Sequence, residues 1–165
     1  MADTDYYPPW LADALLSDTL PWERAARIRL SDFLAAYTLH DSEWINFSLD
    51  PIYDGGAVAV IRWDTIWTDG RVAFPGSFVA DWPLLFLRFH RVHRASQDGY
   101  ESGSPVPTRG IGSAECRPAG DVSRVITVIA DHYGAQLEIE HAPEVDVLCL
   151  DRAGAVVPVP GFGAA

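Results

Sequence analysis

The feature that most constrains the fold is a change of hydrophobic period near residue 40. Before it, apolar residues recur every three to four positions, at Trp22, Ala26, Leu30, Phe33 and Tyr37. This spacing is typical of the buried face of a helix, so it predicts a helix over residues 20–37. After it, runs with a period of two or with continuous apolar character follow one another along the chain.

These later runs predict strands, because glycine, proline and aspartate turns separate them. The predicted strands cover residues 44–49, 57–63, 82–92, 111–117, 124–130, 136–141 and 145–150. A short helix over residues 10–16 precedes the long one. Helices followed by strands favour an α+β fold. We expect an antiparallel β-sheet of six or seven strands, with one or two N-terminal helices packed on one face.

The chain length fits one ordinary domain, so residues 1–165 are interpreted as a single α+β domain. Residues 95–109 are rich in serine, glycine and proline, which predicts a flexible loop. Residues 155–165 are apolar but interrupted by prolines. They predict an extended C-terminal tail that packs on the domain or frays.

The charge of the chain restricts its partners. It carries 23 acidic residues against 12 basic ones, all of them arginine, and its net charge is −11. Such a chain repels nucleic acid and anionic lipid and attracts basic molecules. We therefore expect a basic protein partner, no nucleic acid and no membrane, with the oligomeric state left open. The acidic N-terminus lacks the apolar stretch of a secretory signal, and Cys116 and Cys149 are interpreted as reduced thiols of a cytoplasmic protein.

Candidate catalytic and metal-binding motifs do not satisfy the geometry that their chemistry requires. His40, Asp41 and Ser42 have the residue types of a catalytic triad, but three consecutive side chains point in different directions. We predict that His40 and Asp41 are mainly structural, with His40 at the C-terminus of the long helix. His90 and His93 lie three apart on a predicted strand and therefore face opposite sides. The sequence predicts no catalytic residue, no metal site and no cofactor.

Acidic side chains near the C-terminus form the first candidate binding region. Glu138, Glu140, Glu144 and Asp146 alternate with apolar residues or follow them closely, which predicts a charged sheet face. A concentrated negative face would steer a basic partner toward it. Trp67 lies near a predicted turn, and we expect it to be an exposed aromatic anchor.

A second candidate region combines polar groups from the helix and the sheet. Tyr37, His40, Arg88 and Arg91 could line a small-molecule pocket or an anion site between them. For Arg88, Arg91 and Arg94, which form a concentrated positive patch, the favoured alternative is internal pairing. In this alternative, the guanidinium groups bind Glu138, Glu140 or Asp146 on neighbouring strands.

One stretch resembles a known group of proteins. Leu-His-Asp-Ser at residues 39–42 enters Trp-Ile-Asn-Phe at 44–47, and a glycine turn then leads to the apolar strand at 57–61. The run at residues 85–92 continues the pattern. Over residues 37–92 the chain is similar to small bacterial proteins of the toxin-immunity kind. The resemblance implies a non-catalytic inhibitor that binds a toxin or effector, and no catalytic residue is carried over. The alternative is a small-molecule binding module or an enzyme.

Overall fold

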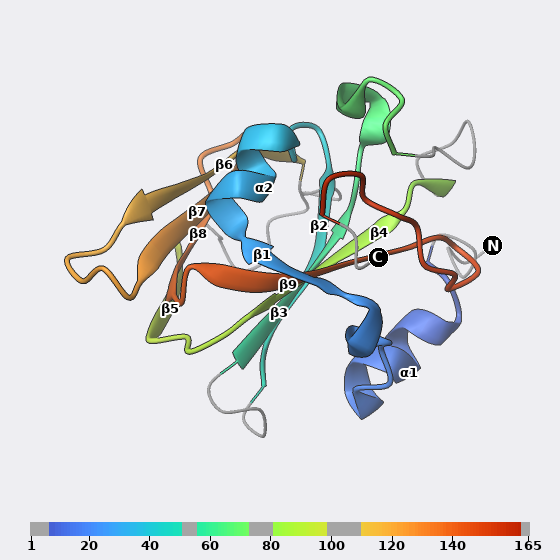
Figure 1. Ribbon diagram of the computed structural model, residues 1–165, viewed down its shortest axis with the longest axis horizontal. Coiled ribbons are helices and arrows are strands. Elements are labelled where there is room, and N and C mark those ends of the chain that lie inside the picture. Colours follow the sequence, from blue (N-terminus) through green and yellow to red (C-terminus); the bar gives the residue numbers. More distant parts are fainter. Residues whose placement is uncertain (1–6, 51–55, 73–80, 99–109, 163–165) are drawn as a thin grey trace.

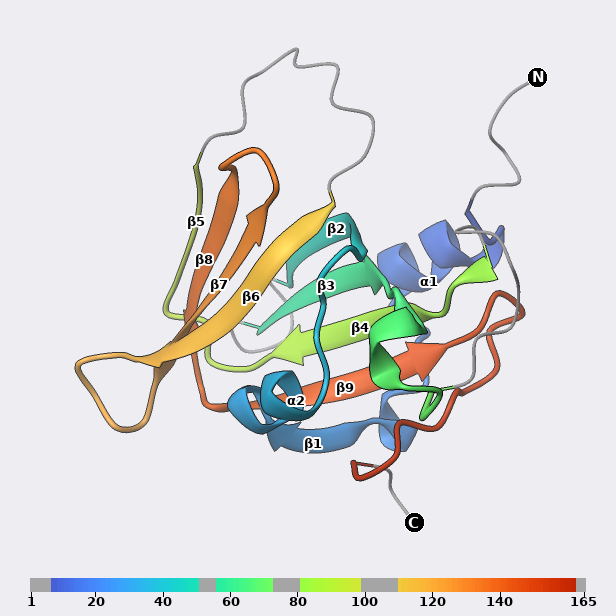
Figure 2. The same cartoon turned by 90° about the horizontal axis from the view of Figure 1, so that it is seen from above.

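The computed structural model describes residues 7–50, 56–72, 81–98 and 110–162, and it shows an α+β fold with two antiparallel sheets (Figures 1 and 2). Sheet A has the order β1-β9-β4-β3-β2, which Figure 2 shows face-on. Its strands are β1 (Ala26–Arg29), β9 (Glu144–Leu150), β4 (Leu84–Phe89), β3 (Gly56–Arg62) and β2 (Glu43–Asp50). Sheet B has the order β5-β8-β7-β6. Its strands are β5 (Arg94–Asp98), β8 (Gln136–His141), β7 (Val125–Asp131) and β6 (Ile111–Pro118).

The helices lie on opposite sides of sheet A (Figure 1). Helix α2 (Leu30–Ala36) buries Leu30 and Phe33 in the main core, together with the inward-facing residues of both sheets. Helix α1 (Trp10–Ser17) buries Leu11 and Ala14 against a smaller cluster on the other face, which includes Phe86. Two short 3₁₀ turns, η1 (Trp22–Arg24) and η2 (Thr65–Thr68), complete the described helical elements.

The two sheets are joined at two places. At one, the chain passes from β4 to β5 and from β8 to β9, and the amide of Ala142 donates to the carbonyl of His90 at 3.0 Å. At the other, which we call the seam, the start of β2 meets the start of β6 through a bridge between Glu43 and Gly110. The amide of Ile111 donates to the Ser42 carbonyl there at 2.7 Å. At the seam, the two sheets are therefore hydrogen-bonded to each other through the starts of β2 and β6.

The predicted α+β class with antiparallel strands is confirmed, but two of its details are wrong. Nine strands form two sheets in the described part of the chain, where we expected six or seven strands in one. The additional sheet arises because the chain turns sharply after β4, where Arg91 adopts a positive φ of 50°, and again between β8 and β9. The helices cover both faces of sheet A, where we expected them on one.

The predicted helix over residues 20–37 is also wrong for most of its length. Only Leu30–Ala36 is α-helical, and Ala26–Arg29 forms the edge strand β1. In this strand Arg27 lies directly opposite Asp146 of β9. Pairing with β9 gives the backbone of this segment its hydrogen-bond partners and gives Arg27 a carboxylate partner. This is a long-range contact that a local period does not reveal.

The predicted loop and tail are only partly as expected. Residues 95–98 belong to strand β5, so that part of the loop prediction is wrong, and residues 99–109 lie outside the described residues. The described part of the tail lies along β9, where the Val157 amide donates to the Cys149 carbonyl at 2.8 Å. The Tyr37 hydroxyl donates to the Pro160 carbonyl at 2.6 Å and fixes the tail over α2. The single-domain interpretation stays a prediction.

Candidate functional site

A rigid turn at the seam presents the Leu-His-Asp-Ser segment. Leu39 and Ser42 are buried, and the Ser42 amide closes the turn by donating to the Leu39 carbonyl at 3.0 Å. The Ser42 hydroxyl oxygen accepts the amide of Asp64 at 2.9 Å. The indole of Trp63 donates to the Thr38 carbonyl at 3.0 Å. These bonds tie the turn to the end of β3 and leave its two central side chains partly exposed.

Those two side chains are His40 and Asp41, and the Asp41 carboxylate lies between two imidazoles. Nδ1 of His40 is 3.0 Å from Oδ2 of Asp41, and Nε2 of His132 is 3.3 Å from Oδ1. The two histidine rings are 5.5 Å apart between centroids. Asp41 has a positive φ of 63°, a conformation that aspartate tolerates better than most residues. Each of the three side chains is roughly 40 to 45% exposed, so the group faces solvent.

Glycines provide the space for His132. A Cβ atom added at Gly110 or at Gly112 would lie 3.1 Å from the His132 ring. A side chain at either position would therefore crowd the His132 imidazole. The two glycines and the backbone bond from Asp41 to Ile111 (2.9 Å) bring the 131–133 turn and the 40–41 turn together.

Exposed apolar side chains lie beside this charged group. The Trp67 ring is 5.7 Å from the His40 ring, edge to face, and Trp67 is 50% exposed. Its neighbour Ile66 is 74% exposed. The turn η2 that carries both is capped by Asp64, whose carboxylate accepts the Ile66 amide at 3.1 Å. Tyr133 is 80% exposed and follows His132 directly. We call His40, Asp41, Ile66, Trp67, His132 and Tyr133 the seam surface.

The segments that carry the seam surface, residues 38–42, 63–72 and 131–134, are acidic. They carry four carboxylates, on Asp41, Asp64, Asp69 and Asp131. Burial raises the pKa of Asp64, and the charge of Asp41 adds to this effect. The one described arginine in these segments, Arg71, donates to the carbonyls of Thr68 and Ala36 and stacks on Tyr37. Its guanidinium is therefore already bound to carbonyls and to a ring of the same protein, although the residue is exposed.

The acidic sheet face that the sequence predicts is largely neutralised by arginines. Glu138 is within 3.4 Å of both Arg94 and Arg117, and Glu140 is 3.1 Å from Arg124. Of the four predicted acids, only Glu144 is exposed. The favoured alternative of internal pairing is therefore confirmed for Arg94. The strip does not present the concentrated negative field on which the prediction depended.

Asp146 is the most deeply paired of these acids. It is 4% exposed and binds Arg27 from β1 and Arg88 from β4, each at 2.9 Å. His90 approaches the same carboxylate at 2.7 Å. Burial alone would raise the pKa of Asp146, but the hydrogen bonds from the two arginines and the nearby histidine together lower it. Internal pairing is thus confirmed for Arg88 as well, and Asp146 is a structural ion-pair centre.

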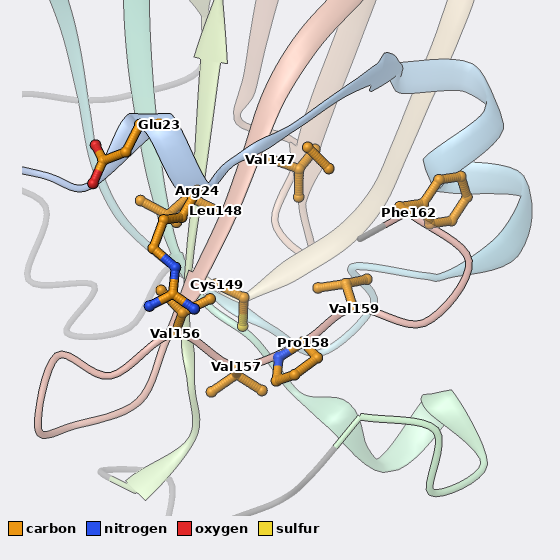
Figure 3. A pocket seen from close by; sticks show the side chains of 11 residues that line it. Glu23, Arg24, Val147, Leu148, Cys149, Val156, Val157, Pro158, Val159 and Phe162 are labelled. Carbon is orange, nitrogen blue, oxygen red and sulfur yellow. The ribbon is translucent and has the colours of Figure 1, made fainter. Parts of the chain in front are cut away.

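The expected pocket between helix and sheet does not gather its four residues. Tyr37 is 2% exposed and holds the tail, whereas His40 lies at the seam and Arg88 is bound to Asp146. Arg91 lines a different cavity and makes no ion pair with any described residue, so the pairing expected for it is wrong. A cavity of about 390 Å³ does exist between β9, η1 and the tail (Figure 3). Its lining is mostly apolar and includes four valines, and its charged residues are Glu23 and Arg24. It contains none of the predicted site residues.

Several site features could not be found from the sequence. No motif distinguishes His132 or Ile66, and the nearest signal for His132 is the pair of glycines that makes room for it. The expectation that His40 covers a helix C-terminus is wrong, because α2 ends at Ala36. Trp67 is exposed, as expected for an anchor, and its role in binding stays a prediction.

Metal, membrane and family comparisons add little to this picture. Among the described residues, no group of three or more histidine, cysteine or acidic side chains could hold a metal ion. In the same part of the chain, no helix is long and apolar enough to cross a membrane. Comparison of the chain with protein-family models, with curated proteins and with solved structures gives no match.

Proposed function

We propose that this protein is a non-catalytic inhibitor of the immunity type, which binds a basic toxin or effector through the seam surface. The observation that carries the proposal is the exposed pair Ile66 and Trp67 on a capped turn, beside the rigid Asp41 group. Large apolar side chains that remain exposed next to polar groups are typical of protein interfaces. Tryptophan is also among the residues that contribute most to binding energy.

Rigidity makes this surface suitable for tight binding. The turn at 38–42 is fixed by bonds to β3 and to Ile111, and η2 is fixed by its Asp64 cap. A surface that is already ordered loses little conformational entropy when a partner binds. The contact energy of Trp67 is therefore available for affinity.

Charge supports a basic partner. Asp41 and Asp69 are exposed in the seam segments, and the chain has a net charge of −11. Opposite charge on the partner would raise the association rate, and salt would reduce this gain. Both described cysteines, Cys116 and Cys149, are free thiols. This supports action in the cytoplasm, where thiols stay reduced.

The test begins with capture of the partner by the tagged protein from a lysate of its host, followed by an assay of the partner's toxicity or enzymatic activity. Wild-type protein should inhibit a basic partner. Trp67→Ala should weaken inhibition by roughly thirtyfold or more, the effect of removing about 2 kcal/mol at an interface hot spot. Leu16→Ala is the matched control, because Leu16 is 87% exposed but lies on α1, away from the seam.

Two results would overturn the proposal. One is inhibition by Trp67→Ala that equals wild type, which would remove the seam surface from binding. The other is a captured partner that is acidic, or whose association rate is independent of ionic strength, since either removes the role of charge. Asp41→Asn should slow association more than it speeds dissociation.

A further inference from the structure

A second pocket lies at the corner where both sheets exchange strands, and its lining is basic. It has a volume of about 360 Å³, and its side chains include Arg27, Arg29, His90, Arg91, Pro143 and Glu144. Three arginines and one histidine thus converge on one cavity of a chain whose net charge is −11. We call this cavity the corner pocket.

Two of these arginines are not used by the fold. Among the described arginines, only Arg24, Arg29 and Arg91 have side chains without a hydrogen bond, ion pair or ring contact. Arg29 and Arg91 both line the corner pocket, whereas Arg24 lines the cavity of Figure 3. An arginine fork without an internal carboxylate is available to bind an anion.

The third arginine, Arg27, and the histidine, His90, are both held in place by Asp146. Arg27 donates to Asp146 at 2.9 Å, and its second nitrogen lies 3.2 Å from Nε2 of His90. Four arginines (Arg27, Arg29, Arg88 and Arg91) stand against two carboxylates (Glu144 and Asp146), which leaves two formal positive charges at this corner. Asp146 balances one of the two arginines that it binds, Arg27 and Arg88, so one positive charge remains there. Glu144 balances one of Arg29 and Arg91, so a second positive charge remains on the pocket lining.

The backbone at Arg91 points to the same conclusion. Arg91 has a positive φ of 50°, in a region that costs most side chains about 1 kcal/mol or more. The turn that holds it is fixed on both sides, by the amide of Ala142 on His90 and by the amide of His93 on Glu140. Arginine is an unfavourable choice for this conformation, and such strain is retained mostly where a side chain has a function.

We propose that the corner pocket binds the phosphate group of a small molecule, held by Arg29 and Arg91 with Arg27 and His90 at its base. Two free guanidinium groups supply the positive charge and the paired N–H donors that bind a phosphate dianion. The cavity volume leaves room for a small organic group attached to the phosphate. Glu144 lies at the same rim, so it disfavours large polyanions and favours a ligand with a polar or cationic part.

Inorganic phosphate is the probe, titrated at neutral pH into the full chain with sodium chloride adjusted to keep ionic strength constant. Binding should be saturable in wild type. The double variant Arg29→Gln/Arg91→Gln should raise the dissociation constant at least about tenfold, since each lost charge-assisted hydrogen bond weakens binding. Both side chains lack internal partners, so the variant should fold, and circular dichroism checks this. Arg24→Gln is the matched control, with an equal change of charge for each substitution and no expected effect.

The outcomes separate the proposal from simple charge attraction. Phosphate binding to wild type that does not saturate would overturn the proposal. So would an equal rise of the phosphate dissociation constant in Arg24→Gln and in the single variants Arg29→Gln and Arg91→Gln. Sodium acetate is titrated in parallel. If acetate binds as tightly as phosphate, the pocket recognises any carboxylate-like anion and the phosphate assignment is wrong. Inhibition of a protein partner through Trp67 is measured separately, so failure at this pocket leaves the seam surface untouched.

Discussion

Protonation of His141 should destabilise the fold at mildly acidic pH. His141 is fully buried at the end of β8, with its ring 4.7 Å from that of Phe89. Its Nδ1 lies 2.6 Å from the Ala142 carbonyl, which can only accept, so Nδ1 carries the proton. Nε2 then accepts from the Thr127 hydroxyl at 2.7 Å. Burial lowers the pKa of His141 from 6.5 to about 4, so the folded protein holds the neutral ring.

The sign and size of the effect follow from proton linkage. Between pH 6.5 and about 4 the unfolded chain binds a proton at this residue that the folded chain does not. The stabilisation that the neutral His141 ring provides is therefore fully present above pH 6.5, and it is lost as the pH falls toward about 4. At pH 4.5 the loss is about 2 to 3 kcal/mol, since each tenfold difference in proton affinity between the two states corresponds to about 1.4 kcal/mol.

Urea unfolding followed by tryptophan fluorescence measures this effect in wild type and in His141→Gln, from about pH 7.5 to pH 4.5. The variant is less stable throughout, because it loses packing against Phe89, but its free energy of unfolding should depend less on pH by about 2 to 3 kcal/mol. Comparing the two curves removes the contributions of Asp64 and Asp146, which both proteins share. His93→Gln, which removes an exposed imidazole, is the control. Parallel pH curves for wild type and His141→Gln would refute the buried neutral ring.

Three further predictions use the same unfolding assay. Asp146→Asn should cost about 2 kcal/mol or more, since it removes the charged partner of the largely buried Arg88 and of the more exposed Arg27. Because the pKa of Asp146 is lowered, its charged form stabilises the fold above the ordinary value of 3.8, and wild type should lose this advantage as the pH falls below it. Tyr37→Phe should cost about 1 kcal/mol by releasing the tail from the Pro160 carbonyl. Ser42→Ala should cost about 1 to 3 kcal/mol, because the buried amide of Asp64 loses its acceptor.

An exposed serine on β2 supplies the control for these substitutions. Ser48→Ala removes a hydroxyl from the same strand that follows Ser42, and its effect should stay within about 0.5 kcal/mol. If Ser42→Ala and Ser48→Ala have equal effects, the Asp64 bond does not stabilise the turn. Unchanged stability in Asp146→Asn would show that the three basic side chains find other partners, and unchanged stability in Tyr37→Phe would show that the tail is held by packing alone.

The strands were predictable where a local pattern decides them. The hairpin of β7 and β8 has alternating Leu137 and Ile139 and a glycine turn, and it forms as predicted, as does β9. Periodicity failed where a distant partner decides the structure. Ala26–Arg29 has both a helical stripe and a strand-like alternation, and the position of Asp146 in β9 selects the strand. No local sequence pattern reveals whether this segment forms the helix or the strand.

The candidate binding residues, too, could be predicted only where a local sequence pattern determines their position. The exposure of Trp67 could be expected from its nearby turn. The group of His40, Asp41 and His132 could not, because His132 reaches Asp41 only when β6 meets β2 at the seam. The acidic strip around Glu138 and Glu140 misled the prediction, because the arginines opposite it come from three other segments of the chain. Charge patterns along one strand say little until the neighbouring strands are known.

The position of β9 in sheet A has a consequence for synthesis of the chain. β9 lies between β1 and β4, although about 115 residues of chain separate it from β1. A nascent chain that has not yet emerged beyond β8 therefore exposes one edge of β4 and leaves β1 without its partner. Arg27 and Arg88 also lack their shared carboxylate until Asp146 appears. Sheet A can close only after β9 has been synthesised, and until then its exposed edges are open to chaperones.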